Sequence, residues 1–150
     1  MSSELRVASC RSPTERDVSA EQHKDRPDIR SRSYAFAMRV VKLVRALPRD
    51  AATVVLARQL VRSATSVGAN VEEAQGGQSR KDFAHKMNIA RKEAGEAHYW
   101  LRLLRDTDTL PRPRLDPIVK ESDEIVRILV TIVKTTRGDA PGERGDQAES

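Results

Sequence analysis

Hydrophobic residues recur every three or four positions through most of the chain, which is the spacing of an amphipathic α-helix. Proline or glycine punctuates the pattern, with Pro48 after the first periodic segment and Gly76-Gly77 after the second. The expected helices cover four segments, at about residues 33–47, 51–74, 79–105 and 115–137. Because four helices with short connections pack most simply side by side, the sequence predicts an all-α, antiparallel up-down-up-down four-helix bundle.

Local signals predict where two of these helices begin and which face of the first is buried. Ser33 is the expected N-cap of the first helix. Ser79, with Asp82 three residues later, is the expected N-cap of the third helix. Gly68 lies inside the second helix, where it lowers helix stability by about 1 kcal/mol, so we expect it to serve close packing. The expected inward face of the first helix consists of Tyr34, Ala37, Met38, Val41, Val44 and Leu47.

The third segment, residues 79–105, has two contact faces. An inward heptad seam is formed by Phe83, Met87, Ala90, Ala94, Ala97, Leu101 and Leu104. A second stripe beside it mixes apolar and charged residues: Lys86, Ile89, Glu93, Glu96, Trp100 and Leu103. We expect this second stripe either to contact another subunit or to pair its carboxylates with arginines of the bundle.

The two ends of the chain, residues 1–32 and 138–150, are polar and lack a hydrophobic period, so we expect disordered tails. The first residues have no apolar stretch of the signal-peptide kind. The apolar runs are far shorter than the ~20 residues that a membrane span needs. The single cysteine, Cys10, is compatible with a reducing compartment. These features predict a cytoplasmic protein that has no membrane partner.

Positive charge is concentrated in the expected bundle, residues 33–137, which carry 19 Lys and Arg against 12 Asp and Glu. Residues 138–150, in contrast, carry one basic and four acidic residues. A basic folded surface fits RNA or DNA as a partner, although solvated charges on a protein that binds no nucleic acid would give the same composition. The candidate phosphate contacts are Arg39, Lys42, Arg45, Arg49, Arg80, Lys81, Lys86, Arg91 and Lys92.

The chain has no recognisable catalytic site, and we expect no enzyme activity, cofactor or metal. A di-iron bundle needs Glu-x-x-His pairs on two helices, and the nearest approach is Asp82-x-x-His85 at a helix start. Neither Glu93 nor Glu96 is followed by a histidine at that spacing. No Ser-His-acid order or phosphate-binding loop is present.

A polar stripe on the second helix includes Arg62. Because a bundle core has little room for an unpaired charge, we expect Arg62 to form a buried ion pair with Glu93 or Glu96. The competing interpretation is an arginine exposed to water. If the pair is buried, replacing Arg62 with alanine should destabilise the protein strongly. Trp100 is expected to pack in the core or at a subunit interface rather than to stack on bases.

The combined pattern over residues 59–104 resembles the four-helix bundle proteins related to the 23S rRNA intervening-sequence protein. The second-helix part is Gln59-Leu60-x-Arg62-Ser63-Ala64-x-Ser66-Val67-x-Ala69-Asn70-x-x-Glu73-Ala74. The third-helix part comprises Ser79, Phe83, Ile89-Ala90-x-Lys92-Glu93-Ala94-x-Glu96 and Tyr99-Trp100-Leu101-x-Leu103-Leu104. The first helix departs from many members because it lacks a tryptophan, and residues 1–32 are an addition.

The resemblance implies a homopentamer of four-helix bundles with a basic surface and no established catalytic residues. A related branch contains accessory proteins of diversity-generating retroelements, thought to bind nucleic acid and a reverse transcriptase. The resemblance also implies that a set of signature residues holds the bundle and the ring together: Arg62, Ser63, Asn70, Glu73, Glu93, Glu96 and Trp100. We therefore expect a non-enzymatic homo-oligomer that binds nucleic acid or plays an accessory role. The alternative is a protein–protein scaffold or adaptor without nucleic acid.

Overall fold

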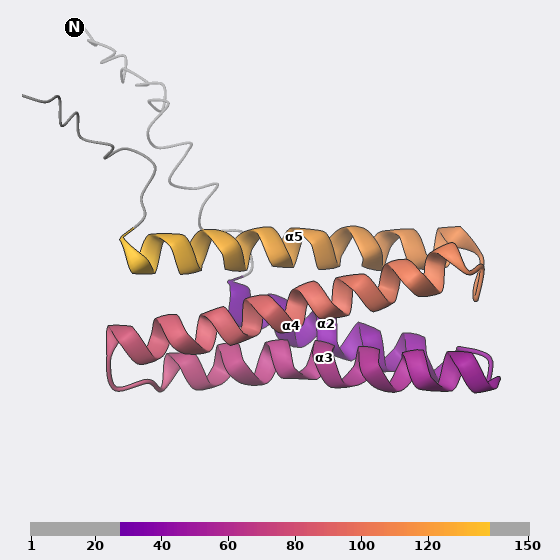
Figure 1. Ribbon diagram of the computed structural model, residues 1–150, viewed down its shortest axis with the longest axis horizontal. Helices are drawn as coiled ribbons and strands as arrows, with labels where there is room; N and C mark the ends of the chain where they lie inside the picture. Colours follow the sequence, from indigo (N-terminus) through magenta and orange to yellow (C-terminus); the bar gives the residue numbers. More distant parts are fainter. Residues whose placement is uncertain (1–27, 139–150) are drawn as a thin grey trace, which may run out of the picture.

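The computed structural model describes residues 28–138, which form four α-helices and no strand (Figure 1). The helices are α2 (Ile29–Arg45), α3 (Ala51–Gln75), α4 (Arg80–Asp106) and α5 (Arg112–Arg137). The predicted all-α, antiparallel four-helix bundle is therefore confirmed. Of the tails expected at residues 1–32 and 138–150, residues 1–27 and 139–150 lie outside the described residues.

Each helix packs against its neighbours in the chain, and α2 also packs against α5, so the four helices close a ring around one core. The α2–α3 and α4–α5 connections lie at one end of the bundle, and the α3–α4 turn lies at the other (Figure 1). The C-terminus of α5 lies at the same end as the α3–α4 turn. Residues from distant parts of the sequence therefore meet at both ends.

Two helices begin earlier than the sequence pattern predicted. Asp28 caps α2, since its Oδ1 accepts the backbone N–H of Ser31 at 2.7 Å, so residues 29–32 are helical and not part of a tail. Ser33 is not the cap; it is buried and donates to the carbonyl of Arg30 at 3.0 Å. Helix α5 begins at Arg112 because Pro113 occupies its first turn, where a missing N–H costs no helical hydrogen bond.

The core is built mainly from the seams of α3, α4 and α5. The α4 seam is in the predicted position: all of its members from Met87 to Leu104 are buried, and Phe83 packs against the core from its edge. Leu60, Leu101 and Leu129 are fully buried, and each contributes about 1.5–3 kcal/mol relative to an exposed side chain. Ser79 caps α4 as predicted, accepting the N–H of Asp82 at 3.1 Å.

The first helix buries only part of its predicted inward face: Leu47 is buried and Val44 packs against the core, but the face centred on Tyr34 and Met38 is not the inward one. Phe36 and Val40 are 1% and 0% exposed, whereas Tyr34 and Met38, which were expected inside, are 63% and 45% exposed. The helix is apolar on two faces, so periodicity alone could not identify the inward one. One apolar face of α2 consequently remains at the surface of the single chain.

Candidate functional site

Arg62 of α3 and two glutamates of α4 form an ion-paired cluster across the α3–α4 interface. One guanidinium nitrogen of Arg62 lies 3.3 Å from Oε2 of Glu93, and the other donates to Oε1 of Glu96. The indole N–H of Trp100 donates to the same Glu96 oxygen at 3.3 Å. The three side chains on α4 lie on one face because they are spaced by three and four residues.

The environment of this cluster favours its charged forms but does not bury them. The hydrogen bond from Arg62 lowers the pKa of Glu96, and the indole N–H of Trp100 acts in the same direction. The Arg62 side chain is 49% exposed. The expectation of a buried pair is therefore wrong, although Arg62 does contact both expected glutamates. Arginine is long enough to reach Glu93 and Glu96 across the outside of the helix interface.

The remaining signature residues do not join this cluster. Ser63 is buried and donates to the carbonyl of Gln59 in its own helix at 3.0 Å. Asn70 likewise donates to the carbonyl of Ser66 at 2.8 Å. Glu73 forms a separate ion pair with Lys86. The predicted polar network is therefore divided into local helix contacts and two ion-paired groups that link α3 to α4.

Residues 28–138 carry 21 Lys and Arg against 13 Asp and Glu. Eight of these cations form ion pairs among the described residues: Arg30, Arg32, Arg39, Arg62, Lys86, Arg105, Arg112 and Arg127. Two of them, Arg39 and Lys86, were candidate phosphate contacts. Arg39 pairs with Glu121 and so connects α2 to α5. The other thirteen have no described carboxylate within 4 Å and can face an anionic partner.

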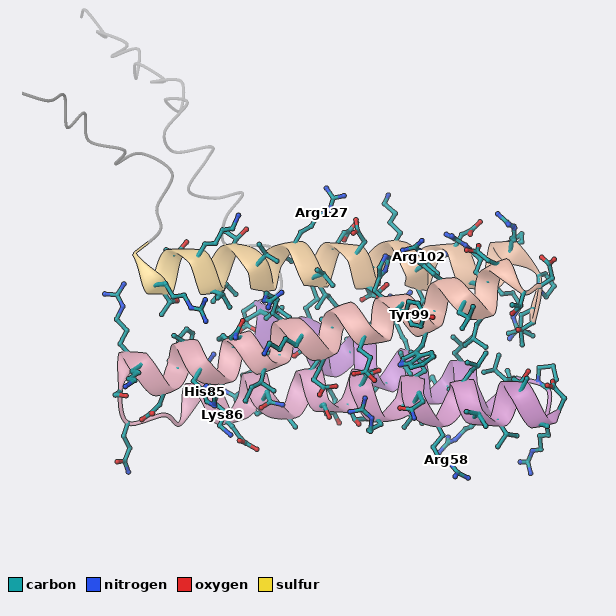
Figure 2. The ribbon with its side chains drawn as sticks, in the orientation of Figure 1. Arg58, His85, Lys86, Tyr99, Arg102 and Arg127 are labelled. Carbon is teal, nitrogen blue, oxygen red and sulfur yellow. The ribbon has the colours of Figure 1, made fainter. Side chains whose placement is uncertain are left out.

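The first group of such cations lies where α2 meets α3. Arg45, Arg49 and Arg58 line an open groove of about 600 Å³, together with Arg62. Its floor is apolar and includes Val54, which is 40% exposed. Figure 2 shows Arg58 projecting from α3 away from α4. Sequence analysis missed Arg58, although its position four residues after Val54 and three before Val61, on the same side of α3, was the available signal.

A second group lies at the opposite end of the bundle, in what we call the end pocket. Arg80, Lys81, His85 and Arg137 line this pocket of about 430 Å³, with Thr136 and Ala84, and no carboxylate lines it. The Nε of Arg80 donates to the carbonyl of Thr136 at 3.2 Å, which satisfies a backbone acceptor at the end of α5. His85 lies on α4 near the α3–α4 turn (Figure 2).

Arg91 and Lys92 lie on the middle turns of α4, away from both groups. Arg91 donates to the side chain of Asn88 at 3.1 Å, and Lys92 is exposed.

Lys42 lies on α2 beside the exposed Met38, in a shallow apolar groove. On α4, Tyr99 is 55% exposed and its ring meets that of Trp100 edge to face, with 4.9 Å between the ring centroids. Tyr99 therefore offers the more accessible of the two aromatic rings.

His98 forms a polar contact that sequence analysis did not identify. Its Nδ1 lies 2.8 Å from the hydroxyl of Ser122, which in turn donates to the carbonyl of Val119 at 2.6 Å. Because the hydroxyl hydrogen is used, Nδ1 carries the hydrogen that His98 donates. Burial lowers the pKa of His98. Ser122 is 1% exposed, so this pair contributes to packing between α4 and α5 rather than presenting a nucleophile.

The described residues contain no group of three or more His, Cys, Asp or Glu that could hold a metal ion. Within residues 28–138, no helix combines the length and hydrophobicity that a membrane crossing requires. The exposed cations, the exposed apolar face of α2, the groove between α2 and α3 and the end pocket are surface features that a partner could use.

Comparisons with known proteins agree with the resemblance seen in residues 59–104. Residues 26–131 match the family described as 23S rRNA-intervening sequence protein. A crystal structure from Bacteroides thetaiotaomicron VPI-5482, of a protein with unknown function from the S23 ribosomal protein family, is 42% identical. The two superpose with a TM-score of 0.66, over 71% of this chain and 99% of that one. A comparison with curated proteins finds no match. The chain belongs to the 23S rRNA-intervening sequence protein family.

Proposed function

We propose that this protein is a non-enzymatic, self-associating bundle that binds the phosphate backbone of RNA or DNA. The observation that carries the proposal is the set of thirteen cations without a carboxylate within 4 Å among the described residues. Lys and Arg side chains that are not neutralised within the protein can replace the counterions of a nucleic acid, and releasing those ions favours binding. The name of the family makes ribosomal RNA the first RNA to test.

The groove between α2 and α3 is the strongest candidate contact surface. Arg45, Arg49 and Arg58 surround an apolar floor, so phosphates could pair with the guanidinium groups while a base or sugar covers Val54. Lys81 and Arg137 in the end pocket, with Lys92 between the two ends, would extend the contact along the bundle. Arg39 and Lys86 are left out of the proposed contacts because their charges are already paired.

The test is binding of the full chain to labelled RNA and DNA at two salt concentrations. If six to ten phosphates are contacted, affinity should fall by about 10³–10⁵ between roughly 50 and 200 mM salt. The triple variant Arg45→Gln/Arg49→Gln/Arg58→Gln should bind more weakly and with a shallower salt dependence, by about 0.7–0.9 per lost phosphate contact. Binding that ignores salt, or no binding at the lower salt, would refute the proposal.

A matched control removes positive charge that is already paired. Arg30 pairs with Glu72 at 2.7 Å and Arg127 pairs with Asp123 at 2.9 Å, and both arginines are exposed. The variant Arg30→Gln/Arg127→Gln should retain most of the affinity for nucleic acid. The control removes two positive charges and the triple variant three, so an equal loss of binding free energy per removed charge would show that only overall charge matters and that the groove is not the contact surface.

The alternative function is a protein–protein scaffold that uses the same groove. An acidic, partly apolar protein surface would also fit arginines around an apolar floor. A self-associating protein that ignores RNA and DNA at low salt would favour the scaffold.

A further inference from the structure

The end pocket carries positive charge that the described residues leave unneutralised. It brings together the first turns of α4 and the last turn of α5, so Arg80 and Lys81 lie near Arg137 although more than fifty residues separate them in the sequence. No Asp or Glu lines the pocket. Bringing these cations together is unfavourable unless an anion or the solvent compensates their repulsion.

The chain leaves the bundle at the wall of this pocket. Thr136 and Arg137 line the pocket, and the next residue, Gly138, ends α5 with a φ of 84°. This left-handed conformation ends the helix at Gly138. Residue 139 is therefore attached one residue after Arg137, which lines the pocket.

The segment that follows is the most acidic part of the sequence. Residues 139–150 contain four carboxylates, Asp139, Glu143, Asp146 and Glu149, against one basic residue, Arg144. Twelve residues span at most about 40 Å when fully extended, far more than the pocket requires. A segment tethered at the pocket wall also has an effective concentration on the order of millimolar, so weak charge–charge attraction is enough to populate the contact.

We propose that the acidic segment 139–150 occupies the end pocket of its own chain and competes there with nucleic-acid phosphates. Its carboxylates would pair with Lys81, with Arg137 and with the guanidinium N–H groups of Arg80 that do not bond to Thr136. The competition rests on the proposed function, whereas occupation of the pocket does not. The segment would lower non-specific affinity for nucleic acid and leave the groove between α2 and α3 available.

A zero-length carbodiimide cross-link tests the occupation without any nucleic acid. In the full chain at low salt, the Lys81 amine should couple to one of the carboxylates of residues 139–150, as read by peptide mass spectrometry. The cross-link should fade as salt is raised, because the attraction is screened. Lys92, exposed on the middle of α4, is the control lysine and should not couple to the segment. Equal coupling to Lys81 and Lys92, or none to Lys81, would overturn the proposal.

A mixture of isotopically light and heavy chains shows which chain supplies the segment. Cross-links confined to one isotope support a contact within the chain, whereas mixed pairs would show that a second copy occupies the pocket and would overturn the proposal. The variant Asp139→Asn/Glu143→Gln/Asp146→Asn/Glu149→Gln retains the length of the segment and removes its negative charge. This variant tests, in the full-length protein, whether the segment competes with nucleic acid for the end pocket.

In nucleic-acid binding, the charge-neutralised segment should raise affinity about three- to tenfold at low salt. The same change made in a Lys81→Gln/Arg137→Gln background should have little effect, because its target is gone. An equal gain in both backgrounds would assign the effect to overall charge and overturn the competition. If no variant binds nucleic acid, the proposed function fails, while the Lys81 cross-link still decides occupation of the pocket.

Discussion

At the scale of single residues, Arg62 pairs with two particular glutamates although its side chain is not buried. It contacts Glu93 and Glu96 and is half-exposed, so water screens much of the interaction. We predict that Arg62→Ala lowers stability only slightly, by far less than Leu60→Ala. Leu60 is fully buried on the same helix, and truncating it should cost about 2–5 kcal/mol. Urea unfolding of both variants provides the comparison.

Trp100, the single tryptophan of the chain, is a fluorescent probe of the cluster that Arg62 forms with Glu93 and Glu96. Trp100 donates to Glu96, so Arg62→Ala and Glu96→Gln should each change its fluorescence in the folded state. A double-mutant cycle of Arg62 and Glu96 should give a small coupling energy that shrinks as salt is added. A loss in Arg62→Ala as large as that in Leu60→Ala would contradict this account.

His98 predicts a pH dependence of stability. Burial lowers its pKa in the folded protein below the ordinary value of 6.5, although the nearby carboxylate of Asp123 opposes this and Arg102 and Arg105 reinforce it. Below pH 6.5 the unfolded chain therefore takes up the proton more readily than the folded one, and the free energy of unfolding falls. This loss begins well above the range in which Glu96, whose pKa is lowered, becomes protonated.

The measurement is urea unfolding at about pH 7.5 and about pH 5.5, on either side of the ordinary pKa of 6.5 at which His98 of the unfolded chain takes up its proton. Full-length protein should be less stable at the lower pH, and His98→Gln should reduce that difference. His85→Gln is the control, because it removes an exposed histidine near the start of α4 and leaves the His98–Ser122 contact unchanged. An unchanged pH dependence in His98→Gln would show that other groups are responsible.

At the scale of the helices, Gly68 does not serve the close approach that the sequence indicated. A Cβ atom built there would lie 3.8 Å from the carbonyl oxygen of Ser33, an ordinary contact distance. We therefore predict that Gly68→Ala raises stability by about 0.5–1 kcal/mol, through the better helix propensity of alanine. Thermal or urea unfolding measures the change.

Gly77 in the α3–α4 turn is the matched control. A Cβ there would lie 3.2 Å from the carbonyl oxygen of Ala74, which is tighter than ordinary contact, so Gly77→Ala should lower stability. A loss of stability in Gly68→Ala would show that α2 and α3 need glycine at their crossing. That result would support the expectation from the sequence that Gly68 serves close packing.

At the scale of the whole molecule, the second apolar face of α2 is the surface best suited to a second copy of the chain. Tyr34 and Met38 are exposed and line a shallow groove with Val41 and Ala37. Exposed apolar residues gathered in one place commonly mark interfaces. The second stripe of α4 was expected either to contact another subunit or to pair its carboxylates with arginines of the bundle, and Glu93 and Glu96 do pair with Arg62.

We predict that Met38→Glu lowers the molar mass measured by light scattering, because a charge in an apolar interface is costly. The helix should persist, since Met38 is 45% exposed in the single chain. Lys92→Glu, on an exposed position of α4, is the control and should leave the mass unchanged. An assembly that keeps its mass in Met38→Glu would place the interface elsewhere, and a wild-type monomer would refute self-association.

The sequence by itself determined the number of helices, their antiparallel order, the seam of α4 and the cap at Ser79. These features depend on local propensity, on periodicity and on short connections, which neighbouring residues specify. The family pattern also predicted which charged residues of α3 and α4 meet.

Only the tertiary structure decided which apolar face of α2 is buried, how far Arg62 is exposed and which cations are neutralised. Both faces of α2 carry apolar residues, Phe36 and Val40 on one and Tyr34 and Met38 on the other, and the choice depends on which face fits between α3 and α5. Pairing of Arg39 with Glu121, the end pocket and the His98–Ser122 contact all join residues far apart in the sequence. Such contacts depend on the relative placement of packed helices, which a one-dimensional period does not specify.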